Sequence, residues 1–177
     1  KVFNIILLSM MVPFAALMVP LFRLFGKFSD IPGLKWISLN TNGSVVIIAI
    51  ATAFLIFFFR QNTKTFPKEL IEAARIDGLG EFSIFTRIYM PTMKSTYAAA
   101  VVVTFMTSWN NYLWPLIALQ SEKKRTLPLV ISAMSSSYTP DYGMMMTAVV
   151  IATLPTAILF FVMQKQFVAG MTGSVKG

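Results

Sequence analysis

Polar groups that could do chemistry are scarce in this chain and fall mainly in two stretches. The first holds four of the seven acidic residues: Glu69, Glu72, Asp77 and Glu81. The second places two amides, Asn110 and Asn111, in an apolar stretch between Trp109 and Trp114. The chain has no cysteine and no histidine, which excludes disulfides, thiolate or imidazole metal sites, and Ser-His or Cys-His nucleophilic pairs. The sequence therefore predicts no catalytic residue and no metal site.

The acidic stretch is the only long amphipathic segment of the chain. Pro67 suits the first turn of a helix, where its missing N–H costs nothing, and Gly78 suits a left-handed stop after Asp77. Apolar side chains then recur at helical spacing, so we expect a second helix over 81–90, ended by Pro91. The pattern predicts two short helices joined by a Gly-x-Gly turn.

The elements that must position these groups are membrane spans. The chain has 177 residues, of which 56% are hydrophobic and 12% charged, against roughly 25% charged in a soluble domain. Four intervals, 2–22, 36–59, 95–121 and 142–164, carry no Asp, Glu, Lys or Arg, and about 20 residues suffice to cross the hydrocarbon core.

We therefore predict an all-α, polytopic membrane helical bundle, a single transmembrane domain over 1–177. Its spans are expected at about 2–25, 40–60, 97–119 and 143–163. Pro13 and Pro20 should kink or shorten the first span, and Pro155 should break the fourth.

Basic residues predict the orientation of these spans. With spans alternating, nine basic residues fall on one side: Lys1, Arg60, Lys64, Lys68, Arg75, Arg87, Lys94, Lys165 and Lys176. Six fall on the other: Arg23, Lys27, Lys35, Lys123, Lys124 and Arg125. Positive charge favours the cytoplasm, so the two-helix element and the C-terminus are expected to be cytoplasmic. We attribute the net charge of +8 to orientation and anionic lipid rather than to nucleic acid.

The acidic stretch also resembles a known sequence pattern. Glu72-Ala73-Ala74, Asp77-Gly78, Phe85, Ile88 and Pro91 resemble the EAA loop in permease subunits of bacterial ABC importers. The carbohydrate, maltose-type version is similar at Arg60-Gln61, Pro67-x-Glu69-Leu70, Trp109-Asn110, Pro115-Leu116, Thr126-Leu127-Pro128-Leu129 and Val175-Lys176-Gly177. A lone E-A-A would carry no weight, whereas this composite pattern in order along nearly the whole chain is specific. Such permeases generally have six spans, so two further spans are expected before Lys1.

The resemblance implies roles for the residues of a coupling loop over 61–96 that seats in a groove of a cytoplasmic ATPase subunit. Glu72 and Asp77 would bond to that subunit, and Ala73 and Ala74 would allow close approach. Gly78 would make the turn, while Phe82 and Phe85 would anchor the second helix, ended by Pro91, against the ends of the spans. Without the resemblance, an amphipathic hairpin lying flat on the bilayer is an equal alternative.

The resemblance also implies the function, which is import of a sugar or related small polar solute across the bacterial inner membrane by alternating access. The chain has no Walker A sequence, so no cofactor is expected on it, and ATP and Mg would be used by the partner ATPase. The implied partners are a second homologous permease, an ATP-binding subunit dimer, an extracytoplasmic solute-binding protein and membrane lipid. Nucleic acid is not expected, because the two-helix element lacks the third helix of a DNA-binding core.

The sequence also bears on two other classes of membrane protein. An ion-driven secondary transporter predicts intramembrane carboxylates, and none lies within the four predicted spans. A non-transporting membrane scaffold would not need the coupling motif.

The role of Trp109, Asn110, Asn111 and Trp114 stays open between two interpretations. They line a sugar route, with a tryptophan stacking on a sugar face, or they lie at the outer interface with the amides bonding neighbouring helices.

Overall fold

The computed structural model describes residues 2–136, 139 and 141–172, with side chains up to residue 164. Every regular element within these residues is helical. The elements are α1 (Val2–Ser9), α2 (Phe14–Lys27), η1 (Lys35–Ile37), α3 (Asn42–Ile50), α4 (Ala53–Lys64), α5 (Lys68–Ile76), α6 (Glu81–Ile84), the π-helical turn η2 (Phe85–Tyr89), α7 (Met90–Thr92), α8 (Lys94–Trp109), α9 (Leu113–Ala118), η3 (Glu122–Lys124), α10 (Leu127–Ser135) and α11 (Tyr142–Thr172).

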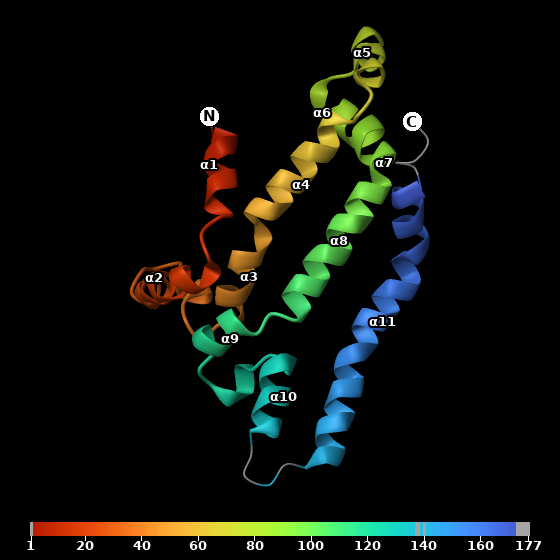
Figure 1. The fold of residues 1–177 in the computed structure, drawn as a ribbon. Coiled ribbons are helices and arrows are strands. Elements are labelled where there is room, and N and C mark those ends of the chain that lie inside the picture. The colour runs from red at the N-terminus through yellow and green to blue at the C-terminus, as the bar shows by residue number, and fades with distance from the viewer. Residues whose placement is uncertain (1, 137–138, 140, 173–177) are drawn as a thin grey trace.

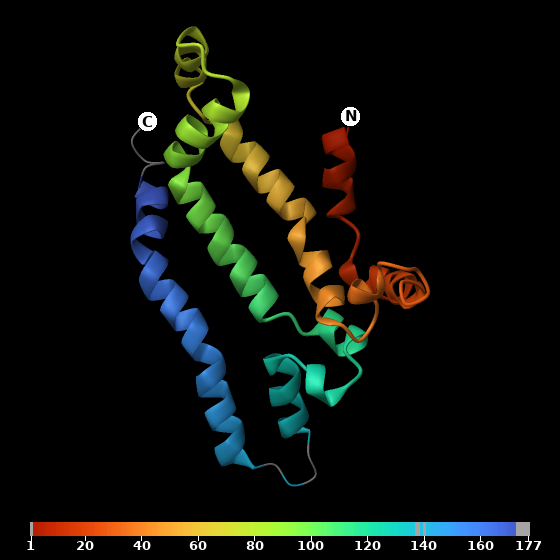
Figure 2. The same cartoon turned by 180° about the vertical axis from the view of Figure 1, so that it is seen from behind.

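Long helices α4, α8 and α11 lie side by side, and α3 extends α4 (Figures 1 and 2). Helix α1 lies beside α4, where the Phe3 ring stacks on Phe57 at 6.5 Å between centroids and the Arg60 guanidinium lies 3.5 Å from the Phe3 ring centre. Helices α5 to α7 project from one end of this array, the end at which α1 begins, whereas α2, α9 and α10 occupy the other (Figure 1). This arrangement matches the predicted helical membrane bundle.

Among the described residues, two or three segments qualify as candidate spans, against the predicted four. By length and apolar composition, the 42–64 segment (α3 and α4) and the 142–164 part of α11 qualify, and α1 with α2 makes a third if that pair, bent by 102°, is one span. Helix α8 has 16 residues, which is about 24 Å at 1.5 Å per residue. The predicted 97–119 span is wrong beyond Trp109, because the chain leaves the helix at the two asparagines and forms the separate short helix α9.

The prolines act differently from one another. Pro13 is the N-cap of α2 at the 102° bend, as the predicted kink required. Pro20 lies inside α2, and Pro155 lies inside α11 without ending it, so the predicted break of the fourth span is wrong. A proline removes one N–H donor, and a long membrane helix tolerates that loss.

The buried core lies at the end opposite the projecting helices. Trp114 is fully buried, and its ring lies edge-on to Phe25 of α2 at 5.3 Å between centroids. Its indole Nε1–H donates to the Ser44 carbonyl of α3 at 2.9 Å. Gly43 lies so close to the preceding loop that an added Cβ would be 2.0 Å from the Trp36 carbonyl oxygen. This core fixes α2, α3 and α9 to one another.

Candidate functional site

The acidic stretch folds as predicted up to its turn. Helix α5 follows Pro67 and ends before Gly78, whose φ is +78°. The Gly78 N–H donates to the Arg75 carbonyl and the Leu79 N–H donates to the Ala74 carbonyl, each at 3.0 Å. This pair of bonds is the Schellman ending, which needs a left-handed residue after the helix, and glycine adopts it without a Cβ penalty.

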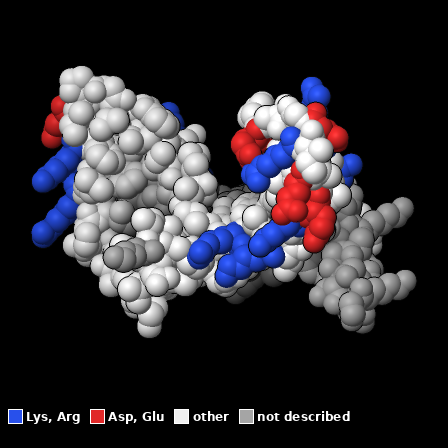
Figure 3. All heavy atoms as spheres, turned by 90° about the horizontal axis from the view of Figure 1, so that it is seen from above, with Lys and Arg blue, Asp and Glu red and all other residues white. Residues whose placement is uncertain are grey.

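Acidic and apolar side chains are both exposed on this loop. Glu72, Ala73 and Asp77 are exposed, and charged side chains of both signs gather on the projecting element seen end-on (Figure 3). Ile76 is 87% exposed and Phe82 is 80% exposed. Phe82 therefore does not pack against the ends of the described spans, and the structure does not support its predicted anchoring of the second helix.

Ala74 differs from the expectation that both alanines face a partner. It is 2% exposed and so is packed within the chain. Of the two alanines, only Ala73 lies at the surface of α5, where its small side chain allows close approach by another protein.

An ion pair joins the two arms of the loop. The Arg75 guanidinium lies 2.9 Å from the Glu81 carboxylate, across the turn at Gly78. Both side chains are more than half exposed, so solvent screening leaves this pair little stabilising energy. It links the end of α5 to the start of α6.

The second helix does not end at Pro91. Helical structure runs through α6, the π-helical turn η2 and α7, which contains Pro91, and is irregular only at Met93 before α8. Because the π-helical turn widens the helix just before the proline, the helix continues past a residue that cannot donate a hydrogen bond. Phe85 on this turn stacks on Tyr89 at 5.8 Å between ring centroids, and its anchoring against the ends of the spans stays a prediction.

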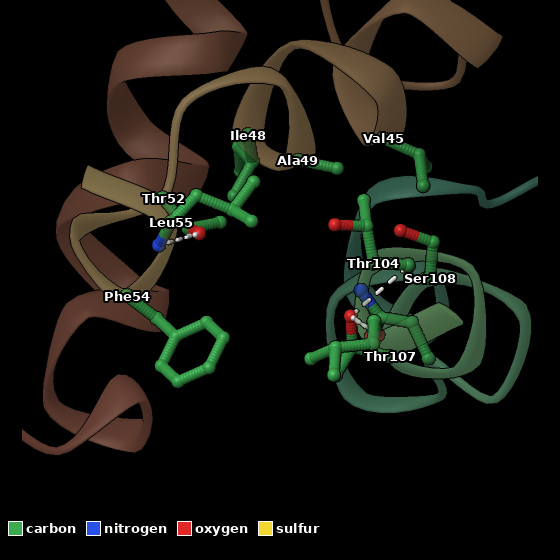
Figure 4. A pocket seen from close by; sticks show the side chains of 11 residues that line it. Val45, Ile48, Ala49, Thr52, Phe54, Leu55, Thr104, Thr107 and Ser108 are labelled. Carbon is green, nitrogen blue, oxygen red and sulfur yellow. Dashed lines mark hydrogen bonds between the residues drawn. The ribbon is translucent and has the colours of Figure 1, made fainter. Parts of the chain in front are cut away.

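A cavity of about 240 Å³ lies between the α3–α4 segment and α8. Its α8 wall carries Thr104, Thr107, Ser108 and, just past the helix, Asn111. Figure 4 shows the Thr104 and Ser108 hydroxyls directed into the space opposite Ile48 and Ala49. These groups donate and accept hydrogen bonds, as a polar solute requires.

The opposite wall contains a break between α3 and α4. Ala51 has φ −136° and ψ 84°, and Thr52 caps α4 by accepting from the Leu55 N–H at 3.2 Å. Non-helical backbone at membrane depth is tolerated where it is buried in protein or lines a water-filled cavity, and Thr52 lines this cavity. Broken helices in transporters commonly mark substrate or ion sites.

The four predicted path residues do not share one site. Asn111 lines the cavity just described, whereas Trp109 and Asn110 line a second one of about 580 Å³ between α8, α10 and α11. The Trp109 indole N–H donates to the Ala152 carbonyl at 3.0 Å. Trp114 is fully buried in the core, so the hypothesis that it stacks on a sugar is wrong.

That these hydroxyls share a cavity was not predicted from the sequence. Thr104, Thr107, Ser108 and Asn111 follow i, i+3, i+4 and i+7 spacing, which places them on one helical face and is the signal that identifies such a stripe. Thr107 makes the intrahelical bond expected of a threonine in a span, donating to the Val103 carbonyl at 2.9 Å. The break at Ala51 has no neighbouring glycine or proline from which it could be predicted.

Comparisons with known proteins cover almost the whole chain. The family described as "binding-protein-dependent transport system inner membrane component" matches residues 2–173. The lactose transport system permease protein LacG of Rhizobium radiobacter is 55% identical over 176 residues, covering 99% of this chain and 62% of LacG. The arabinooligosaccharides transport system permease protein AraQ of Bacillus subtilis is 41% identical over 177 residues, covering 99% of this chain and 60% of AraQ.

A third relative is named for a different solute. The sn-glycerol-3-phosphate transport system permease protein UgpE of Salmonella typhi is 35% identical over 166 residues, covering 92% of this chain and 58% of UgpE. The chain spans about three fifths of the length of these three relatives.

Proposed function

The chain belongs to the family of binding-protein-dependent transport system inner membrane components, and from that premise we propose that it is a permease subunit of an ATP-driven importer. Its solute is a sugar or a related small polar molecule, as the names of LacG, AraQ and UgpE suggest for those relatives. The chain itself is not an enzyme. ATP and Mg are used by a separate ATP-binding subunit dimer, and the other partners are a second homologous permease and an extracytoplasmic solute-binding protein.

The observation that carries this proposal is the projecting loop formed by α5 and α6. It presents Glu72 and Asp77 together with the exposed apolar side chains of Ile76 and Phe82. An apolar surface next to charges, held away from the ends of α4 and α8 (Figure 1), favours a protein partner over a hairpin lying flat on the bilayer. We assign that partner as the cytoplasmic ATPase, whose closure moves the loop and tilts the spans.

The cavity between α3–α4 and α8 is the proposed solute path of this subunit. Its hydroxyls and the Asn111 amide suit the hydroxyl groups of a sugar. None of its lining residues is Asp or Glu among the residues described, which favours ATP as the energy source over an ion-coupled secondary transporter. The coupling loop likewise disfavours a non-transporting scaffold.

Charge reversal at the loop tests the proposal. In the assembled transporter, Glu72→Lys is expected to abolish solute import and solute-stimulated ATP hydrolysis together, because it places a cation where the ATPase surface meets a carboxylate. The matched control is Glu122→Lys, an exposed acid in η3 at the opposite end of the molecule. Unchanged import and hydrolysis in Glu72→Lys would contradict the proposed coupling.

A further inference from the structure

Tyr89 joins the loop to the end of α4. Its ring lies 5.1 Å from the Phe66 ring and 5.8 Å from the Phe85 ring, measured between centroids. Phe66 is 5% exposed and follows α4 directly, whereas Phe85 belongs to the π-helical turn of the loop. Tyr89 therefore contacts one aromatic ring just after α4 and one aromatic ring on the loop.

A hydrogen bond also connects Tyr89 to α4. The Tyr89 hydroxyl bonds to the hydroxyl of Thr63 in the last turn of α4. Thr63 already donates its single proton to the Phe59 carbonyl at 2.8 Å, so Tyr89 is the donor in the pair. The side chain is thereby fixed both by stacking and by a bond to α4.

The same end of α4 is also tied to α8. The Thr96 hydroxyl donates to the Asn62 side-chain oxygen at 3.4 Å, and the rings of Phe59 and Tyr97 lie 5.2 Å apart. A displacement that reaches the last turns of α4 therefore also reaches the first turns of α8, which forms one wall of the proposed solute path.

The loop joins α4 through a non-helical segment but joins α8 through continued helical hydrogen bonds. Residues 65–67 between α4 and α5 are not helical. At Met93, between α7 and α8, the helical bonds continue, because the Met93 N–H donates to the Tyr89 carbonyl and the Tyr97 N–H donates to the Met93 carbonyl, each at 3.0 Å. A helix transmits force along its axis only while its hydrogen bonds continue, so between the loop and α4 the side-chain contacts must carry part of the displacement. Tyr89 makes the contacts that bridge the loop and α4.

We propose that Tyr89 is a positioning residue that transmits movement of the loop to α4 and α8. This inference rests on the proposed function, because it presumes that an ATPase moves the loop. Tyr89 does not bind the ATPase and does not touch solute. It determines how much of the loop movement becomes movement of the solute path.

The test uses the complete transporter reconstituted in vesicles and measures three quantities. These are co-purification of the ATP-binding subunit, the rate of ATP hydrolysis, and the number of solute molecules imported per ATP. Tyr89→Ala is expected to leave co-purification unchanged and to lower import per ATP about tenfold, within the usual range of coupling between sites. Tyr142→Ala is the matched control, because that tyrosine is 66% exposed at the far end of α11.

Two milder variants isolate the hydrogen bond and guard against misfolding. Tyr89→Phe keeps the ring stack, and Thr63→Val removes the other partner of the same bond. Each is expected to lower import per ATP about threefold. The double variant should show no further loss, because both changes remove the same bond between Tyr89 and Thr63.

Different outcomes separate failure of this inference from failure of the proposed function. Import per ATP that stays normal in Tyr89→Ala overturns the transmission role, as does loss of the ATP-binding subunit from that variant, which would place Tyr89 at the docking surface. A wild-type complex without ATP-dependent import would instead overturn the proposed function.

Discussion

Two tryptophans illustrate how residue type alone misleads about role in this chain. Trp109 and Trp114 are five positions apart, and both indole N–H groups donate to a backbone carbonyl. Trp114 is fully enclosed by the core, whereas Trp109 borders an open cavity between α8, α10 and α11. The difference arises because helix α8 ends between them, so that Trp114 is carried on α9 into contact with α2 and α3.

The hydroxyls of the first cavity give a prediction at this scale. Thr104→Val keeps the shape of the side chain and removes its hydrogen-bonding group. If that group meets the solute, the KM of import should rise about fivefold, since one hydrogen bond contributes about 1 kcal/mol. Uptake of radiolabelled solute by the assembled transporter measures this change.

Thr147→Val is the control for that substitution. Its hydroxyl is exposed on α11 and donates to the Gly143 carbonyl of its own helix, so the KM should not change. An equal rise of KM in both variants, or none in Thr104→Val, would argue against contact between the cavity and the solute.

The elements are shaped by local interruptions more than by their hydropathy. The 42–64 segment is long and apolar enough to cross a membrane. Its helix nevertheless ends at Ala51, and a new helix begins at the Thr52 cap. The second loop helix contains Pro91 but continues through it, with a π-helical turn just before. The first irregularity lies beside the proposed solute path, and the second lies where the proposed coupling loop meets the spans.

Gly43 supplies a stability prediction for the start of α3. Gly43→Ala would place a Cβ 2.0 Å from the Trp36 carbonyl oxygen, so η1 and α3 must separate. We expect the free energy of unfolding to fall by about 1–3 kcal/mol, measured as a lower thermal midpoint in detergent.

Gly26→Ala is the matched control in α2. There an added Cβ would meet Leu39 at 3.6 Å, an ordinary contact, and alanine in a helix is favoured over glycine by roughly 0.5–1 kcal/mol. Its thermal midpoint should stay the same or rise, and a loss equal to that of Gly43→Ala would contradict the steric explanation.

The whole molecule is an array of helices with most of its apolar surface uncovered. In the most apolar windows of the 42–64 and 142–164 segments, 6% and 0% of the residues are buried. Among the described residues, a cluster of buried side chains around Trp114 lies at the end formed by α2, α3 and α9. Such an array is stable in lipid or against further helices, as the proposed assembly with a second permease requires.

The orientation of the molecule can be tested directly because the chain contains no cysteine. The structure places α5 and η3 at opposite ends of the long helices (Figure 2). With the loop in the cytoplasm, a membrane-impermeant maleimide should label Lys123→Cys in intact cells. It should label Lys68→Cys, at the start of α5, only after the membrane is opened.

The two variants control each other, because both replace an exposed lysine. Labelling of Lys68→Cys in intact cells would reverse the proposed topology. Lys176 and the terminal Val175-Lys176-Gly177 match lie outside the described residues, so the predicted side of the C-terminus stays a prediction that the same labelling can test.

The sequence by itself determined the features that depend on neighbouring residues. Charge-free intervals identified a helical membrane protein, and Pro67 and Gly78 placed the start and stop of α5, because propensity and turn chemistry act within a few positions. Only the tertiary structure decided which polar groups share a cavity. Asn110 and Asn111 are adjacent in the chain but line different cavities, and Trp114 is buried by contacts with residues about 70 and 90 positions away, at Ser44 and Phe25. Contacts across such separations depend on how helices pack, which no local pattern in the sequence specifies.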